Sequence, residues 1–194
     1  MLSRLPWMLV LFRLAAGPAM IGLAVLGRPG LCALLLALGV LSDIFDGIIA
    51  RRLKVATEGL RTWDSRADVV FWISAFAAVA VARPGLIPLL WPAAALIAAL
   101  EVLNHLVSFA RFRREASPHH YLSKLFGLGL WALVAQALLT GAVLPTLWIV
   151  LALGVASQIE AFAITMRLKE WRCDVPSVFS LKAETTVRRR GRVT

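Results

Sequence analysis

The sequence is poor in acidic residues and in cysteine. Only 11 of its 194 residues are Asp or Glu, against 21 Lys or Arg, so the formal net charge is +10. Two cysteines, Cys32 and Cys173, are too few for the disulfide framework of a small secreted domain. We expect both to be free thiols, because the topology predicted below places them on opposite sides of a membrane.

Apolar residues, in contrast, are abundant. The chain is 60% hydrophobic and its mean hydropathy is +0.79, values typical of polytopic membrane proteins. A strongly basic chain could bind nucleic acid or an anionic membrane surface, and the hydropathy favours the membrane. Because no aromatic or motif context for nucleic acid accompanies the basic residues, we expect no nucleic-acid partner.

Six apolar segments, each close to the ~20 residues that cross a bilayer, predict an all-α protein with six transmembrane helices. The segments are residues 6–26, 31–53, 64–81, 86–109, 122–142 and 144–168. They predict one transmembrane domain over residues 1–168 and a basic cytoplasmic tail over residues 169–194. The first segment is not expected to be a cleaved signal peptide, because it is long and contains Arg13.

The distribution of basic residues predicts the orientation. With a cytoplasmic N-terminus, all but three of the 21 Lys and Arg residues lie on the cytoplasmic side; Arg13 lies within a helix, and Arg28 and Arg83 lie outside. The positive-inside rule then places both termini in the cytoplasm. We therefore expect a multi-pass protein of the cell membrane whose basic tail is attracted to anionic lipid headgroups.

The few acids concentrate between residues 43 and 68. Asp43 and Asp46 end one apolar segment, and Asp64 and Asp68 begin the next. Residues three or four apart share a helix face, so each pair presents two carboxylates on one side of its helix. Because acids in membrane-spanning helices are costly, they indicate a functional site.

Four carboxylates in one place need cations, since like charges do not stay ionised together unaided. Hard oxygen ligands favour Mg²⁺, Mn²⁺ or Ca²⁺ over zinc. We expect two divalent ions, Mg²⁺ or Mn²⁺, in a position to bridge the oxygens of a diphosphate. The predicted ligands are Asp43, Asp46, Asp64 and Asp68. The alternative is that these are scattered loop acids paired with nearby arginines.

The acidic segment resembles the signature of the class-I, integral-membrane CDP-alcohol phosphatidyltransferase family. That signature is Asp, two residues, Asp-Gly, two residues, Ala-Arg, and later two Asp four apart. The matching positions are Asp43, Asp46, Gly47, Ala50, Arg51, Asp64 and Asp68.

Two positions depart from the family's pattern. Leu60 stands where the family has a second glycine, so the turn before Asp64 could be shaped differently. In the first segment the spacing from Arg13 to Pro18 resembles the family's first helix, but Val10 replaces the threonine often found three residues before the arginine.

The resemblance implies transfer of a phosphatidyl or related group from a CDP-linked lipid, such as CDP-diacylglycerol, to an alcohol acceptor, with release of CMP, in phospholipid biosynthesis. It implies that Asp68 is the general base for the attacking hydroxyl; a role as metal ligand alone is the alternative. The number of subunits stays open and includes a homodimer. The residues assigned to the CDP-lipid are Asp43, Gly47, Ala50, Arg51 and Thr57.

The acceptor is inferred from basic residues at the predicted cytoplasmic helix ends. Arg111, Lys124 and Arg167 would suit a phosphorylated acceptor such as glycerol 3-phosphate or inositol phosphate. The alternative is that they only determine topology.

Other polar residues give two further expectations. A stripe on the fourth segment either joins helices or contacts an uncharged alcohol. Its members, at i, i+3 and i+4, are Glu101, Asn104 and His105. His119 and His120 share a loop with a proline, and we expect them to be solvated.

A divalent-cation transporter or channel is the alternative from another functional class, because acids inside helices also mark ion paths. Against it, the four clustered acids lie near one side of the membrane, and the first and fifth segments carry no acid. A purely structural membrane subunit is the third hypothesis. Release of CMP from CDP-diacylglycerol distinguishes the enzyme from both.

Overall fold

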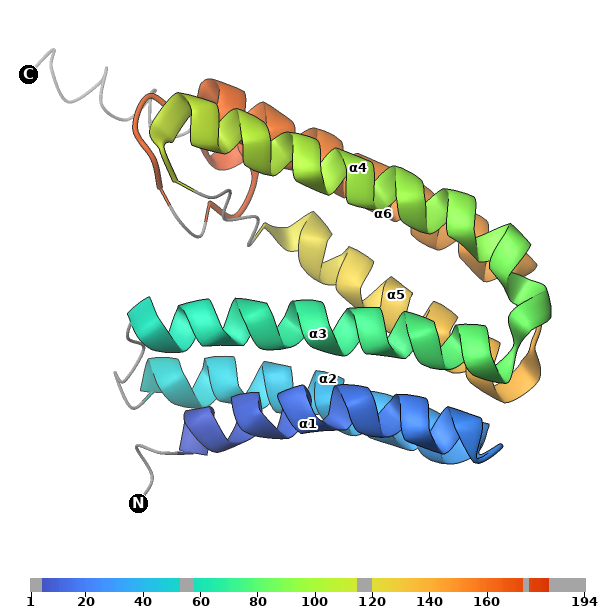
Figure 1. The fold of residues 1–194 in the computed structure, drawn as a ribbon. Coiled ribbons are helices and arrows are strands. Elements are labelled where there is room, and N and C mark those ends of the chain that lie inside the picture. Colours follow the sequence, from blue (N-terminus) through green and yellow to red (C-terminus); the bar gives the residue numbers. More distant parts are fainter. Residues whose placement is uncertain (1–4, 53–57, 115–119, 173–174, 182–194) are drawn as a thin grey trace, which may run out of the picture. The chain divides into compact units, whose positions relative to one another are not determined.

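The computed structural model describes residues 5–52, 58–114, 120–172 and 175–181. Within these residues, six helices are long and apolar enough to cross a membrane (Figure 1). They are α1 (Leu5–Val25), α2 (Pro29–Arg52), α3 (Glu58–Ala82), α4 (Ile87–Phe112), α5 (Tyr121–Thr140) and α6 (Leu144–Arg167). The predictions of an all-α fold and of six membrane-spanning helices are confirmed.

The helix bounds follow the apolar segments closely, with one exception. α3 begins at Glu58, six residues before the predicted start at Asp64. Residues 58–63 therefore join the helix although they are not part of the apolar segment, and an acid such as Glu58 is favourable in a first helical turn. As a result, Asp64 and Asp68 lie inside α3, in its second and third turns.

The turn between α1 and α2 follows directly from two residues. Gly27 has a φ of 67°, which glycine adopts without steric cost, and its N–H donates to the carbonyl of Ala24. Pro29 begins α2 at a position where a missing N–H leaves no helical bond unmade. The two helices are thereby joined by a short reversal of the chain.

The helices form two units, which are described separately. The first comprises Met1–Ile87 and Trp131–Val143, and so contains α1, α2, α3 and the second half of α5. The second comprises Pro88–Leu130 and Leu144–Thr194, with α4, the first half of α5, and α6. The two units differ in their internal contacts. The boundary between domain and tail at residue 168 stays a prediction.

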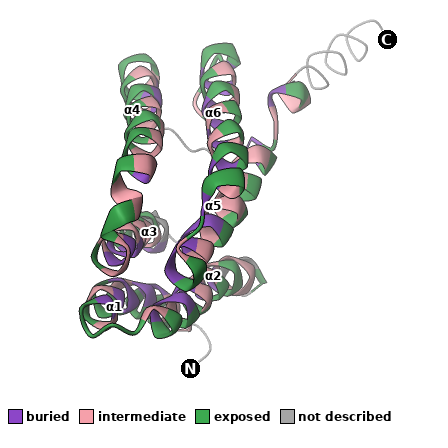
Figure 2. Cartoon of the chain, turned by 90° about the vertical axis from the view of Figure 1, so that its right-hand side faces the viewer, coloured by how far each residue is buried: buried purple, intermediate pink, exposed green. Residues whose placement is uncertain are grey.

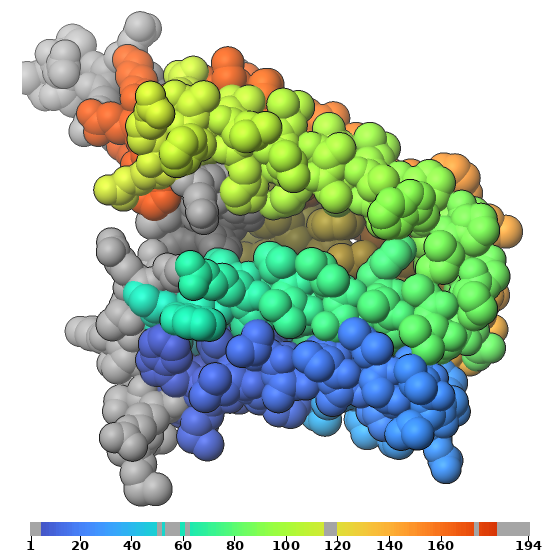
Figure 3. All heavy atoms as spheres, in the orientation of Figure 1, coloured from blue at the N-terminus to red at the C-terminus, as the bar shows by residue number. Residues whose placement is uncertain are grey.

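In the first unit, α1 packs against both α2 and α3, whereas α2 and α3 make few contacts with each other. Figure 3 shows the side chains of α1 directly against those of α3 along the helix. Small residues allow this packing: a Cβ at Gly17 on α1 would lie 2.9 Å from the hydroxyl of Ser74 on α3. The limited contact between α2 and α3 also needs a glycine, because a Cβ at Gly39 on α2 would lie 2.2 Å from the ring of Phe71 on α3. At the far end of α3, Arg83 donates to the carbonyl of Leu138 on α5.

In the second unit, three helices meet at Gly154 on α6. A Cβ there would lie 2.7 Å from Ile97 on α4 and 2.8 Å from Phe126 on α5. α4 buries a smaller share of its side chains than any of the other five membrane-length helices, as its mostly exposed surface in Figure 2 shows. Apolar side chains that remain exposed on a membrane-spanning helix are suited to contact with lipid.

The chain that follows α6 is held against the second unit. Val175 and Val178 belong to an apolar cluster with Ile164 and Leu168. Glu160 on α6 accepts hydrogen bonds from the hydroxyl of Ser177 at 2.9 Å and from the N–H of Val178 at 3.2 Å. The first part of the predicted tail therefore packs against α6.

This packing corrects one prediction. His120 was expected to be solvated, but it is completely buried, with Nε2 3.2 Å from the hydroxyl of Ser157. Its ring lies against α6, where Nε2 is also 3.2 Å from the carbonyl of Ser157 and 3.8 Å from the carboxylate of Glu160. The N–H of Tyr121, the next residue, donates to the carbonyl of Pro176. His119 lies outside the described residues. Cys32 is a free, buried thiol as predicted, and Cys173 lies outside the described residues.

Candidate metal centre

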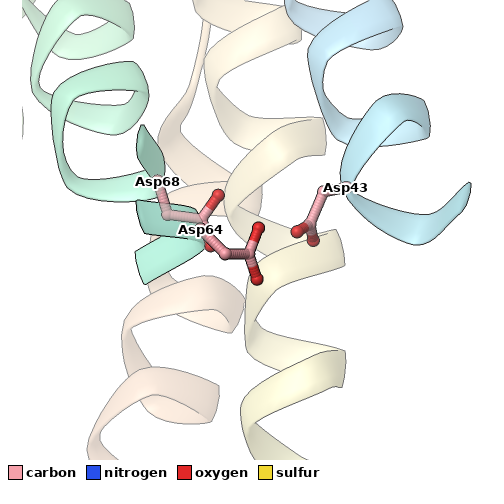
Figure 4. A group of neighbouring side chains, drawn as sticks. All are labelled: Asp43, Asp64 and Asp68. Atoms are coloured by element: carbon pink, nitrogen blue, oxygen red, sulfur yellow. The ribbon is translucent and has the colours of Figure 1, made fainter. Parts of the chain in front are cut away.

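The two acidic pairs face one another from two helices. Asp43 and Asp46 lie in the C-terminal part of α2, and Asp64 and Asp68 lie in the N-terminal part of α3. Figure 4 shows the carboxylate of Asp43 directed toward those of Asp64 and Asp68. One carboxylate oxygen from each of these three residues lies within 4.8 Å of the other two. The helical spacing that predicted shared faces has thus produced a cluster.

The cluster is closed on one side and accessible on the other. Asp46 is 5% exposed. The side chains of the other three acids keep 47%, 34% and 38% of their surface exposed, in the order Asp43, Asp64 and Asp68. Three of the four carboxylates are therefore accessible to a ligand.

A fifth residue, Arg13 on α1, completes the cluster. Its Nη1 donates to Asp43 and Asp68, and its Nη2 donates to Asp64 and, at 2.6 Å, to Asp46. Arg13 is fully buried, with 0% of its surface exposed. Each terminal nitrogen thus binds one carboxylate from α2 and one from α3.

This role of Arg13 was not predicted from the sequence. A signal was present, because a charged residue within an apolar helix nearly always pairs with another charge. The alternative of loop acids paired with nearby arginines does not describe this arrangement. The acids are helical, and the arginine that binds all four lies at least 30 residues away in the sequence.

The donor set suits a hard divalent cation. It consists of carboxylate oxygens alone, and three of them converge within the distance given above. Three of the four predicted ligands, Asp43, Asp64 and Asp68, form this group, and Asp46 stays a predicted ligand.

The positions assigned to the CDP-lipid are described only in part. Gly47 follows Asp46 directly on α2 and is partly buried. Ala50 and Arg51 belong to the end of α2, but their side chains lie outside the described part of the structure, as does all of Thr57. Their contacts with the donor remain predictions.

The two departures from the signature lie in one place. Leu60 is 6% exposed and belongs to an apolar cluster with Val10 and Ala67, beside Leu14. Where the family has a glycine and often a threonine, this chain therefore has two larger apolar residues that pack together. Because Val10 lies one turn before Arg13 on α1, this packing holds the part of α1 that carries the arginine against α3.

The three basic residues assigned to the acceptor all belong to the second unit, and all are exposed. Arg111 donates to the carbonyl of Leu168 at 3.1 Å, which ties the end of α4 to the end of α6. Lys124 lies 5.8 Å from the ring centroid of Tyr121, and Arg167 lies in the last turn of α6. Their role in acceptor binding remains a prediction.

The polar stripe on α4 joins helices. Asn104 donates to the side chain of Gln158 on α6 and, at 3.2 Å, to its carbonyl. Gln158 in turn donates to Glu101, and Nδ1 of His105 lies 3.0 Å from the carbonyl of Glu101. These contacts support the helix-joining interpretation of the stripe.

Comparison with known proteins agrees with this geometry. A family model described as CDP-alcohol phosphatidyltransferase matches residues 3–166, a range that contains Arg13 and all four aspartates. Neither the curated proteins nor the solved structures gave a match. Since the family model covers most of the chain, the protein belongs to the CDP-alcohol phosphatidyltransferase family.

Proposed function

We propose that this protein transfers a phosphatidyl or closely related group from a CDP-linked lipid, such as CDP-diacylglycerol, to a phosphorylated polyol and releases CMP. Family membership shows the coarser activity, phosphatidyl transfer from a CDP-alcohol in phospholipid biosynthesis. The observation that carries the proposal is the convergence of the acidic pairs of α2 and α3, with three carboxylates open to one side.

Divalent cations, two of Mg²⁺ or Mn²⁺, are part of this proposal. Asp43, Asp46, Asp64 and Asp68 would hold them, because the four supply only hard oxygen donors. When bound, such ions neutralise the charge of a diphosphate and orient its oxygens.

Asp68 is proposed as the general base. Its carboxylate is accessible and takes the proton of the acceptor's hydroxyl as that oxygen bonds to the lipid-side phosphorus. The bond from this phosphorus to the bridging oxygen breaks, and CMP leaves with the electron pair. A role for Asp68 as ligand alone is the alternative, and its effect on the pH dependence of the rate distinguishes the two.

The substrates are assigned to different parts of the chain. The nucleotide is proposed to lie against α2, where Gly47 and Ala50 have little or no side chain, with Arg51 and Thr57 near its phosphates. The acceptor is proposed to be glycerol 3-phosphate or inositol phosphate, bound through its phosphate by Arg111, Lys124 and Arg167. Their exposure at helix ends supports this assignment.

The membrane side of the site is proposed from the distribution of charge. The acids lie toward the C-terminal end of α2 and the N-terminal end of α3, and the sequence around this connection is rich in basic residues. By the positive-inside rule, this supports a site on the cytoplasmic side. Single cysteines introduced near Arg113 should react with an impermeant reagent only from the cytoplasm. Cysteines near Arg28 and Arg83 should react only from outside, and the reverse pattern would contradict the proposal.

The decisive experiment is an assay of the purified protein in lipid vesicles with labelled CDP-diacylglycerol and Mg²⁺. We expect release of CMP that requires both the metal and a phosphorylated acceptor. An uncharged alcohol in place of glycerol 3-phosphate or inositol phosphate is the control for acceptor class. Uptake of Mn²⁺ into the vesicles without release of CMP would instead favour the transporter alternative.

A further inference from the structure

The two acidic pairs are joined through α1 rather than through each other. α2 and α3 make few mutual contacts, and both pack on α1. Arg13 is the residue of α1 that binds both pairs, since each of its terminal nitrogens bonds one carboxylate of α2 and one of α3. Its guanidinium therefore contacts all four carboxylates.

The same oxygens cannot serve Arg13 and a metal equally well. A guanidinium bonded to a carboxylate lowers the negative charge available to a second cation and repels that cation directly. Four carboxylates would balance the charge of two divalent ions. Arg13 adds one positive charge, so among these five side chains and two divalent ions one positive charge remains to be balanced by another ligand. A diphosphate supplies that missing negative charge.

We propose that Arg13 is a built-in counter-cation that makes metal binding depend on the diphosphate of the CDP-lipid. Without metal it holds the acidic pairs of α2 and α3 together. With metal it weakens the affinity of the free protein, so that ions are held firmly only when the nucleotide is present. This inference rests on the proposed function in one respect: it takes the acidic cluster to be a metal site.

The test measures Mn²⁺ binding to the full-length protein by the loss of the free-ion signal in electron paramagnetic resonance, with and without CDP. Arg13→Gln should bind Mn²⁺ more tightly than the wild type without CDP, on the order of tenfold, because one repelling charge is gone. CDP should tighten Mn²⁺ binding clearly in the wild type and much less in Arg13→Gln, since coupled ligands act reciprocally. Arg83→Gln is the matched control, because Arg83 bonds to α5 in the same unit and touches none of the acids.

Stability gives a second measurement that does not depend on activity. In EDTA, Arg13→Gln should melt at a lower temperature than the wild type, and Mn²⁺ should restore it. Arg13→Lys keeps the positive charge but loses the two terminal nitrogens that bond both helices. CDP should therefore still tighten Mn²⁺ binding in this variant, but its melting temperature in EDTA should be lower than that of the wild type. If Arg13→Gln does not fold, Arg13→Lys provides the test. A melting temperature of Arg13→Lys in EDTA equal to that of the wild type would overturn the proposal.

The outcomes separate this inference from the proposed function. Mn²⁺ binding in Arg13→Gln that is equal to or weaker than in the wild type overturns the role of Arg13, even if the wild type releases CMP normally. A wild type that binds no Mn²⁺ overturns both the metal site and this inference. Release of CMP by the wild type, measured in parallel, shows which of the two has failed.

Discussion

The two units of this protein use polar side chains in apolar helices for different purposes. In the first unit, Arg13 on α1 bonds four carboxylates on α2 and α3, and three of these acids stay accessible. In the second unit, Asn104 and Gln158 join two helices through amide hydrogen bonds and are themselves buried. Both arrangements satisfy polar groups that lipid cannot, but in the first unit three accessible carboxylates converge, whereas the polar stripe of the second unit contains one carboxylate, Glu101.

This comparison shows that a polar stripe at helical spacing does not by itself indicate a substrate site. The stripe on α4 and the pairs on α2 and α3 have the same spacing in the sequence. They differ in what lies opposite: a neutral amide of α6 in one case, and further acids in the other.

The largest effect should come from removing one acid of the first unit. Asp43→Asn, Asp46→Asn and Asp64→Asn should each lower the rate of CMP release by at least ~100-fold, the scale of losing one electrostatic contact to developing charge. Helical content measured by circular dichroism should stay unchanged. The matched control is Glu101→Gln in the second unit, for which we expect a rate within a few-fold of the wild type. Near-normal activity of an aspartate variant in saturating Mg²⁺ would exclude that residue as a ligand.

The next effect concerns substrate binding by the second unit. Arg111→Ala and Lys124→Ala should raise the KM for a phosphorylated acceptor about ten- to hundredfold, because a hydrogen bond to a charged group contributes about 1.5–3 kcal/mol. The KM for the CDP-lipid should hardly change. Steady-state kinetics with both substrates varied provides the measurement. An unaltered acceptor KM in both variants would leave these residues as determinants of topology and would direct the search toward an uncharged acceptor.

A smaller effect, on stability alone, compares the packing of the two units. Gly39→Ala should lower the free energy of unfolding by about 1–3 kcal/mol, because the new methyl group would meet the rigid ring of Phe71. Gly154→Ala should cost less, since the closest approaches there, 2.7 Å to Ile97 and 2.8 Å to Phe126, are less severe than the 2.2 Å at Gly39. Thermal melting in detergent compares the two variants. A larger loss for Gly154→Ala would show that α6 is packed more rigidly than α2.

The smallest effect is expected for the amide contact between α4 and α6. Asn104→Ala should reduce stability by about 0.6–1.7 kcal/mol, the range for interhelical hydrogen bonds in membranes. The kcat and both KM values should stay within twofold of those of the wild type. A selective rise in acceptor KM would instead assign Asn104 to the acceptor site and weaken the contrast between the two units.

The sequence by itself determined the helices and the faces of the acids. Hydropathy and length located six spans to within a few residues at most ends, because the bilayer sets the length of a crossing helix. Spacings of three and four placed Asp43 with Asp46 and Asp64 with Asp68, because a helix repeats every 3.6 residues. Both inferences need only the local geometry of one helix.

Only the tertiary structure decided what lies opposite each polar residue. Arg13 contacts the acids, Val10 packs with Leu60, and His120 is buried against Ser157 of α6. Each contact depends on how far one helix is rotated and shifted along its axis relative to another. That setting is fixed by side-chain packing summed over whole interfaces, such as the fit of Phe71 against Gly39, and no spacing within a single segment contains it.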